Sequence, residues 1–136
     1  MRWIVIVAVM VVIVSSAYVI RYVCESRRER VREASYTTIL REYAEQFKTG
    51  LTRKEAEEHL RARRIAFTHT CCPYKAGIVA DLIRIGREKA GWPCREKWIY
   101  IGFDFHAAEP HDDPLKAYET DVLDEVKIFR QMVGCL

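Results

Sequence analysis

Glycine and proline are scarce in this chain, with 6 Gly and 4 Pro among 136 residues. That composition excludes collagen-like and low-complexity proteins, and the length allows one domain at most. A strong excess of one charge is also missing, because 22 basic and 19 acidic side chains leave a net charge of only +3. A strongly basic nucleic-acid-binding protein is therefore not expected, and we predict no nucleic-acid partner.

Sequence motifs of the common enzyme classes are missing too. The chain contains no Gly-rich phosphate loop, no nucleophile elbow, no H-E-x-x-H motif, no dinucleotide-binding fingerprint and no Cys-x-x-Cys pair. The sequence therefore favours a non-enzymatic protein. We predict no catalytic residue, no metal ligand and no cofactor.

One long apolar run stands at the beginning of the chain. Residues Trp3 to Ile20 carry no charge, and as a helix these 18 residues span about 27 Å, close to the roughly 30 Å of a hydrocarbon core. We predict a transmembrane anchor over residues 1–23, with residues 3–23 in contact with the lipid bilayer. A cleaved signal peptide is the alternative, because Ser15-Ser16-Ala17 loosely fits a small-x-small cleavage site.

Two observations disagree about the side of the membrane on which the rest of the chain lies. Five arginines follow the apolar run within a dozen residues, and the positive-inside rule then favours a cytoplasmic domain: Arg21, Arg27, Arg28, Arg30 and Arg32. An even set of four cysteines in the domain favours an oxidising compartment. We predict a single-pass membrane protein with an extracytoplasmic domain, and the cytoplasmic side stays open as the alternative.

Two helices are predicted after the anchor. Residues Glu25 to Lys48 contain neither Gly nor Pro and place apolar side chains at helical spacing, which predicts a juxtamembrane helix over 24–49. Gly50 ends that helix. Thr52 and Glu55 then have the spacing of a capping box, which predicts a second helix from Thr52 to Arg64.

Alternating apolar and polar residues predict strands in the remainder. The four candidates are Ile65–Cys71, Ile78–Ile85, Lys97–His106 and residues 122–133. The third is the clearest, because Ile99, Ile101, Phe103 and Phe105 occupy one of its faces. Helices followed by strands predict a small α+β domain over 50–136, in which three or four antiparallel strands carry the helices on one face.

The start of the second helix resembles that of a known family. Gly50-Leu51-Thr52-Arg53-Lys54-Glu55 matches the Gly-hydrophobic-Ser/Thr-x-x-Glu pattern of the SmpA/OmlA (BamE-like) small envelope domains. The resemblance implies a capped short helix followed by three or four antiparallel strands. The chain departs from that family by having an apolar segment in place of a lipidated cysteine, and by its four domain cysteines. As a whole it is similar to small membrane-anchored proteins of bacteria.

The four domain cysteines are candidates for structural disulfides: Cys71, Cys72, Cys94 and Cys135. Three connectivities are possible. A bond between adjacent cysteines is strained, so we expect one or both of Cys71 and Cys72 to pair with Cys94 and Cys135. Closing a loop of about 40 residues would stabilise the domain by roughly 3–4 kcal/mol. Reduced buried cysteines, metal ligation together with His69, and redox catalysis are the alternatives.

A second group of polar residues is a weaker candidate for chemistry. Asp104 and His106 share a strand face, and His111, Asp112 and Asp113 follow in the next loop. These side chains could form a metal site or an acid–base pair. An exposed polar turn is the simpler interpretation.

These observations predict a membrane-anchored, non-enzymatic interaction or structural module of the bacterial envelope. Its predicted partners are the lipid bilayer and another envelope protein. The first alternative is a metal- or thiol-dependent envelope enzyme that uses His69, Cys71, Cys72 or residues 106–113. The second alternative is an accessory subunit of a larger membrane complex.

Overall fold

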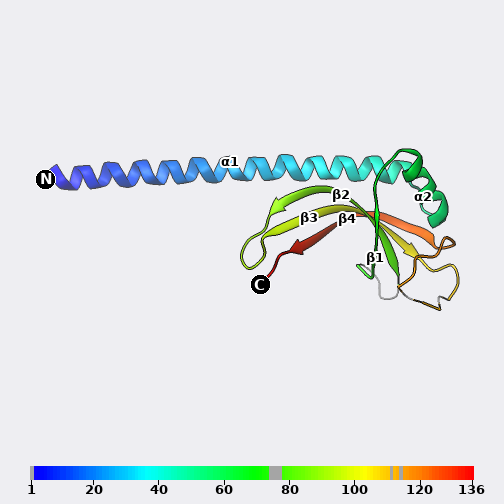
Figure 1. Ribbon diagram of the computed structural model, residues 1–136. Helices are drawn as coiled ribbons and strands as arrows, with labels where there is room; N and C mark the ends of the chain where they lie inside the picture. Colours follow the sequence, from blue (N-terminus) through cyan, green and yellow to red (C-terminus); the bar gives the residue numbers. More distant parts are fainter. Residues whose placement is uncertain (1, 74–77, 111, 114) are drawn as a thin grey trace. The chain divides into compact units, whose positions relative to one another are not determined.

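The computed structural model describes residues 2–73, 78–110, 112–113 and 115–136. Within them, two helices precede four strands in the chain (Figure 1). The chain divides into two compact units, one up to Thr37 and one from Thr38 to Leu136. The second unit therefore holds the last turns of the first helix, the second helix and the sheet.

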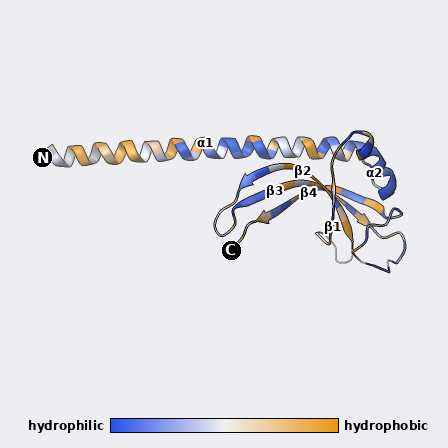
Figure 2. Ribbon diagram, viewed as in Figure 1, coloured by the Kyte–Doolittle hydropathy of each residue, from blue (hydrophilic) through white to orange (hydrophobic). Residues whose placement is uncertain are grey.

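The first helix, α1, runs without a break from Arg2 to Gln46. The predicted anchor and the predicted juxtamembrane helix are thus one continuous element, because this stretch has no Gly or Pro to interrupt it. Its first half is apolar and its second half is mostly polar (Figure 2). It is long and apolar enough to cross a membrane, and its apolar part is not buried inside the structure.

The second helix, α2, spans Arg53–Ala62 and begins with the predicted capping box. The Glu55 amide donates to the Thr52 hydroxyl over 3.3 Å, and the Thr52 amide donates to the Glu55 carboxylate over 2.8 Å. Two donors that would otherwise lack helical partners are thereby satisfied. The helix ends before the predicted Arg64, because the backbone of Arg64 has a φ of 58°, outside the helical range.

The strands are β1 (Thr68–Cys71), β2 (Val79–Lys89), β3 (Glu96–His106) and β4 (Val122–Val133). They form one antiparallel sheet in the order β1-β2-β3-β4, which confirms the predicted α+β class. β1 starts later than predicted. β2 continues beyond the predicted end at Ile85, because a register shift between Arg84 and Gly86 accommodates the glycine within the strand.

The main core lies between the helices and one face of the sheet. The predicted inward face of β3 is confirmed, since Ile99, Ile101, Phe103 and Phe105 are each 0% exposed. The other buried members come from the residue after α1, from α2, from β2 and from β4, and they are Phe47, Ala56, Leu60, Ile83 and Leu123. The opposite face carries a smaller cluster of Ala80, Leu82 and Tyr100, with Trp98 and Phe129 packed against it.

The four domain cysteines are paired differently from the prediction. Cys94 bonds to Cys135, and Cys71 bonds to its neighbour Cys72. The expected link between the two pairs is therefore wrong. The sheet explains why Cys94 pairs with Cys135. Cys94 precedes β3 and Cys135 follows β4, and the start of β3 lies beside the end of β4 in the antiparallel register. Cys71 ends β1, and β2 is the neighbour of β1 among the described strands.

Candidate functional site

A buried arginine joins the start of α2 to the sheet. Arg53 is 1% exposed, and its Nη1 lies 2.6 Å from Oδ1 of Asp81, which is also 1% exposed. Its Nη2 donates to the main-chain carbonyl of Val79 on the same strand. The capping box places Arg53 at the first position of α2, so its side chain enters the domain next to the amino-terminal end of β2.

A second carboxylate and an aromatic ring complete the surroundings of this guanidinium. Nη2 of Arg53 lies 3.3 Å from Oδ2 of Asp121, which is 1% exposed. The main-chain amide of Arg53 also donates to the Asp121 carbonyl over 2.7 Å. The ring of Phe105 lies against the guanidinium, with its centroid 4.1 Å from Cζ, a favourable cation–π distance.

Two further polar side chains lie near the Asp81 carboxylate. Nδ1 of His69 lies 2.8 Å from Oδ1 of Asp81, and these two residues are opposite each other in the register of β1 and β2. Glu57, one turn after Arg53 on α2, is 8% exposed and is contacted by the Arg61 guanidinium. We call Arg53, Glu57, His69, Asp81 and Asp121 the α2–β2 cluster.

The protonation of Asp81 reflects these contacts. Burial raises the pKa of its carboxyl, because the interior stabilises the charged form less than water does. The Arg53 guanidinium and the hydrogen bond from His69 lower the pKa in opposition, and burial outweighs them. An additional positive charge beside this buried carboxylate would therefore stabilise its ionised form.

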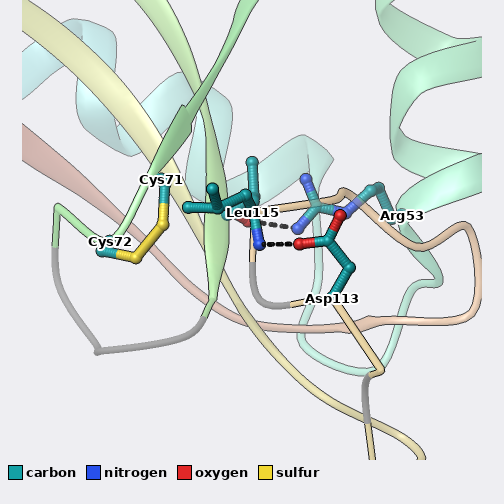
Figure 3. The surroundings of a disulfide bond; sticks show 6 residues. Arg53, Cys71, Cys72, Asp113 and Leu115 are labelled. Carbon is teal, nitrogen blue, oxygen red and sulfur yellow. Dashed lines mark hydrogen bonds between the residues drawn. A yellow bond between two sulfur atoms is a disulfide. The ribbon is translucent and has the colours of Figure 1, made fainter.

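Three residues are predicted as candidates for a metal- or thiol-dependent enzyme: His69, Cys71 and Cys72. His69 is in the cluster, and Cys71 lies two residues further along the same short strand. Figure 3 shows the Cys71–Cys72 disulfide with Arg53 in its surroundings. The backbone of Cys72 has a φ of 65°, in the left-handed region that residues with a side chain rarely adopt.

Among the residues that the structure describes, the second predicted group does not assemble around His106. His106 is exposed at the end of β3, while the buried Asp104 pairs with Lys127 over 2.9 Å. Asp113 accepts a hydrogen bond from the Leu115 amide over 2.9 Å, as in an ordinary turn (Figure 3). His111, a member of the predicted group, lies outside the described residues.

Three cluster members carry no conspicuous motif in the sequence: Glu57, Asp81 and Asp121. Asp81 could have been found from its position, because it interrupts the apolar run of β2 on the face that also carries Ile83. An acidic side chain in that position needs a buried cationic partner. Glu57 and Asp121 offer no comparable indication.

A different feature lies at the open edge of the sheet. β1 pairs with β2 only from Val79 to Leu82, so in the described chain residues 83–89 of β2 have a paired strand on the β3 side alone (Figure 1). Two surface hollows adjoin this edge. One, of about 320 Å³, is lined by Phe67, Leu82, Arg84, Trp98 and Tyr100, together with Ala66 and Thr68. The other, of about 310 Å³, is lined by Arg84, Ile85, Gly86 and Arg87.

Comparisons with known proteins find no match for this chain among family models, curated proteins or solved structures. The resemblance to the SmpA/OmlA family therefore stays a prediction.

Proposed function

We propose that this chain is a single-pass, membrane-anchored interaction module of the bacterial envelope, without catalytic activity of its own. One observation carries the proposal: the described side chains in the apolar half of α1 are exposed, whereas the domain from Thr38 onward has its own buried core. Apolar surface on that scale is unstable in water. A lipid bilayer would cover it.

The helix satisfies its own polar groups, as a membrane segment must. All main-chain hydrogen bonds of a helix are internal, which suits a solvent that offers no partners. The Ser16 hydroxyl donates to the carbonyl of Val12 over 2.7 Å, so this polar side chain also has a partner within the helix. Trp3 and Tyr22 stand near the two ends of the apolar run, where interfacial aromatic residues are favoured.

The disulfides support an extracytoplasmic position for the domain. Both bonds would be reduced in most cytosols, whereas they persist in an oxidising compartment. The arginines that follow the apolar run weigh against this orientation. Because the disulfides lie in the domain itself, we propose the outward side.

The proposed docking surface is the open edge of β2 from Ile83 to Lys89. A partner segment in extended conformation could add to this edge by main-chain hydrogen bonds, as β1 does at the start of β2, from Val79 to Leu82. Arg84, Arg87 and Lys89 are exposed there. Arg87 pairs with Glu96 over 3.6 Å, and Glu88, the one acidic residue of the edge, pairs with Lys97 over 2.6 Å, so the two ion pairs leave an excess of positive charge at Arg84 and Lys89. The charge of the edge therefore favours an acidic partner.

The hollow beside Trp98 adds a place for a side chain. The Arg84 guanidinium lies over the Trp98 ring, 5.2 Å from its centroid, at the rim of this hollow. An apolar side chain of the partner could enter it while an acidic neighbour meets Arg84. We therefore propose that the partner is an acidic, extended segment of another envelope protein.

Site-specific photo-cross-linking tests this proposal on the full chain in its membrane. A photoreactive residue at position 87, whose side chain is 68% exposed, should cross-link to an acid-rich segment identified by mass spectrometry. The same group at position 54, 59% exposed on α2, is the matched control and should give no such product. Adding Arg84→Glu should abolish the product at position 87.

Two results would contradict the docking surface. One is equal cross-linking from positions 87 and 54. The other is a product at position 87 that persists with Arg84→Glu or maps to a basic segment. A protein recovered from the soluble fraction would instead contradict the anchor, so the two parts of the proposal fail separately.

A further inference from the structure

Three side chains with ligand atoms meet in the α2–β2 cluster from three different elements. Glu57 comes from α2, His69 from β1 and Asp81 from β2, and one potential ligand atom of each lies within 4.8 Å of the others. Two carboxylates and one imidazole are donors that Zn²⁺ and other first-row divalent cations accept. The register that places His69 opposite Asp81 makes their proximity a property of the sheet.

One buried carboxylate oxygen of this group has no hydrogen-bond donor among the described residues. Asp81 is 1% exposed, and its Oδ1 receives both the Arg53 guanidinium and the His69 imidazole. Its Oδ2 is buried, and no residue in the described part of the chain donates a hydrogen bond to it. A buried carboxylate oxygen without a donor is costly, and a coordinated cation removes that cost.

We infer that Glu57, His69 and Asp81 bind one divalent transition-metal cation, for which Zn²⁺ is the best match to the donors. The side chain of His69 is 47% exposed, which gives the cation a path from solvent and leaves room for water as a fourth ligand. The hydrogen bond between His69 and Asp81 is the contact that the cation replaces. This site goes beyond the proposed docking function and is independent of it.

Two arginines next to the site orient its ligands and also weaken its affinity for a cation. Arg53 holds the Asp81 carboxylate from the side, in the manner of an outer-shell partner that orients a metal ligand. The positive charges of Arg53 and Arg61 oppose the cation, and the contact between Arg53 and Asp121 offsets part of that repulsion. We therefore expect binding weaker than that of a zinc site built from thiolates.

Zinc titration of the full chain in detergent, with its disulfides oxidised, tests the inference. The background is Cys24→Ser, because Cys24 is the free cysteine and could bind zinc itself. We expect one Zn²⁺ per chain, and affinity lower by about tenfold or more in His69→Ala and in Glu57→Gln. His59→Ala and His106→Ala, which remove exposed histidines outside the cluster, should leave the affinity unchanged.

Two further measurements keep the test decisive. Circular dichroism checks that each variant is folded, and Glu57→Gln preserves side-chain shape in case His69→Ala does not fold. X-ray absorption at the zinc edge should show one imidazole, oxygen donors and no sulfur. The inference is overturned by the absence of stoichiometric zinc, by equal affinity in His69→Ala, or by sulfur ligands at the zinc.

Discussion

Arg53 and Asp81 form a buried ion pair, with 2.6 Å between Nη1 and Oδ1, that ties the first residue of α2 to the amino-terminal part of β2. Both side chains are 1% exposed. Burying two charges costs several kcal/mol of desolvation, so such a pair is stable only when its geometry and its additional hydrogen bonds are good. Here the guanidinium also reaches Val79 and Asp121, so one side chain holds three separate segments together.

Removing the arginine should therefore be far more harmful than removing a neighbouring cation. Arg53→Met leaves buried carboxylates without their cation and should lower the free energy of unfolding by about 3–5 kcal/mol. Lys54→Met is the matched control, because Lys54 forms an exposed pair with Glu119 over 3.6 Å and should change stability by about 0.5 kcal/mol or less. Urea denaturation of the full chain in mild detergent measures both. Equal effects of the two substitutions would contradict this account of Arg53.

The capping box should make helix α2 sensitive to acid. The hydrogen bonds that Glu55 receives from the Thr52 amide and hydroxyl lower the pKa of its carboxyl below the ordinary value of 4.5. A lowered pKa in the folded state adds stability that is fully present above the unfolded pKa and is lost as the pH falls through the folded pKa. A pH titration followed by NMR should show the Glu55 carboxyl titrating below its ordinary range.

Thr52→Ala removes one partner of that carboxylate and tests the same box. The substitution should raise the Glu55 pKa toward its ordinary value and lower the stability at neutral pH by about 1 kcal/mol, as for other lost helix caps. Thr37→Ala is a suitable control, because the Thr37 hydroxyl donates to the Glu33 carbonyl within α1 and has no part in the capping box. An unchanged Glu55 pKa in Thr52→Ala would show that the hydroxyl contributes nothing.

The two disulfides should contribute very unequally to stability. Cys94 and Cys135 are 41 residues apart, and closing a loop of that length stabilises the folded state by about 3–4 kcal/mol in the chain-entropy model. Cys71 and Cys72 are adjacent, so their bond closes no comparable loop. Denaturation of the Cys94→Ser/Cys135→Ser variant should show the larger loss, with Cys71→Ser/Cys72→Ser as its control. A larger loss in the control would refute this assignment.

Much of the fold could be predicted because its determinants are local. The capping box at Thr52 and the alternation of residues 99–105 act over a few positions, and both occur in the structure as expected. The length of β2 could not be read in the same way. Gly86 is typical of a strand end, but pairing with β3 carries the strand past it, and that pairing is a long-range effect.

The candidate site was only partly visible, for a related reason. The imidazole of His69 makes it a candidate ligand from the sequence alone, but its partner Asp81 is twelve residues away and becomes its neighbour through the β1–β2 register. The sequence places Arg53 at a helix start, while its role in the interior depends on where β2 lies. The cysteine pairing could not be predicted for the same reason, because it depends on which strand ends the sheet brings together.

The central claim is that the apolar half of α1 remains in the molecule as a membrane tether. The most direct test expresses the full chain with a carboxyl-terminal tag, extracts membranes with alkaline carbonate and determines the intact mass of the recovered protein. We predict that the protein stays in the membrane pellet with a mass that includes residues 3–23. Recovery of a soluble species whose mass begins near Tyr18 would contradict the tether.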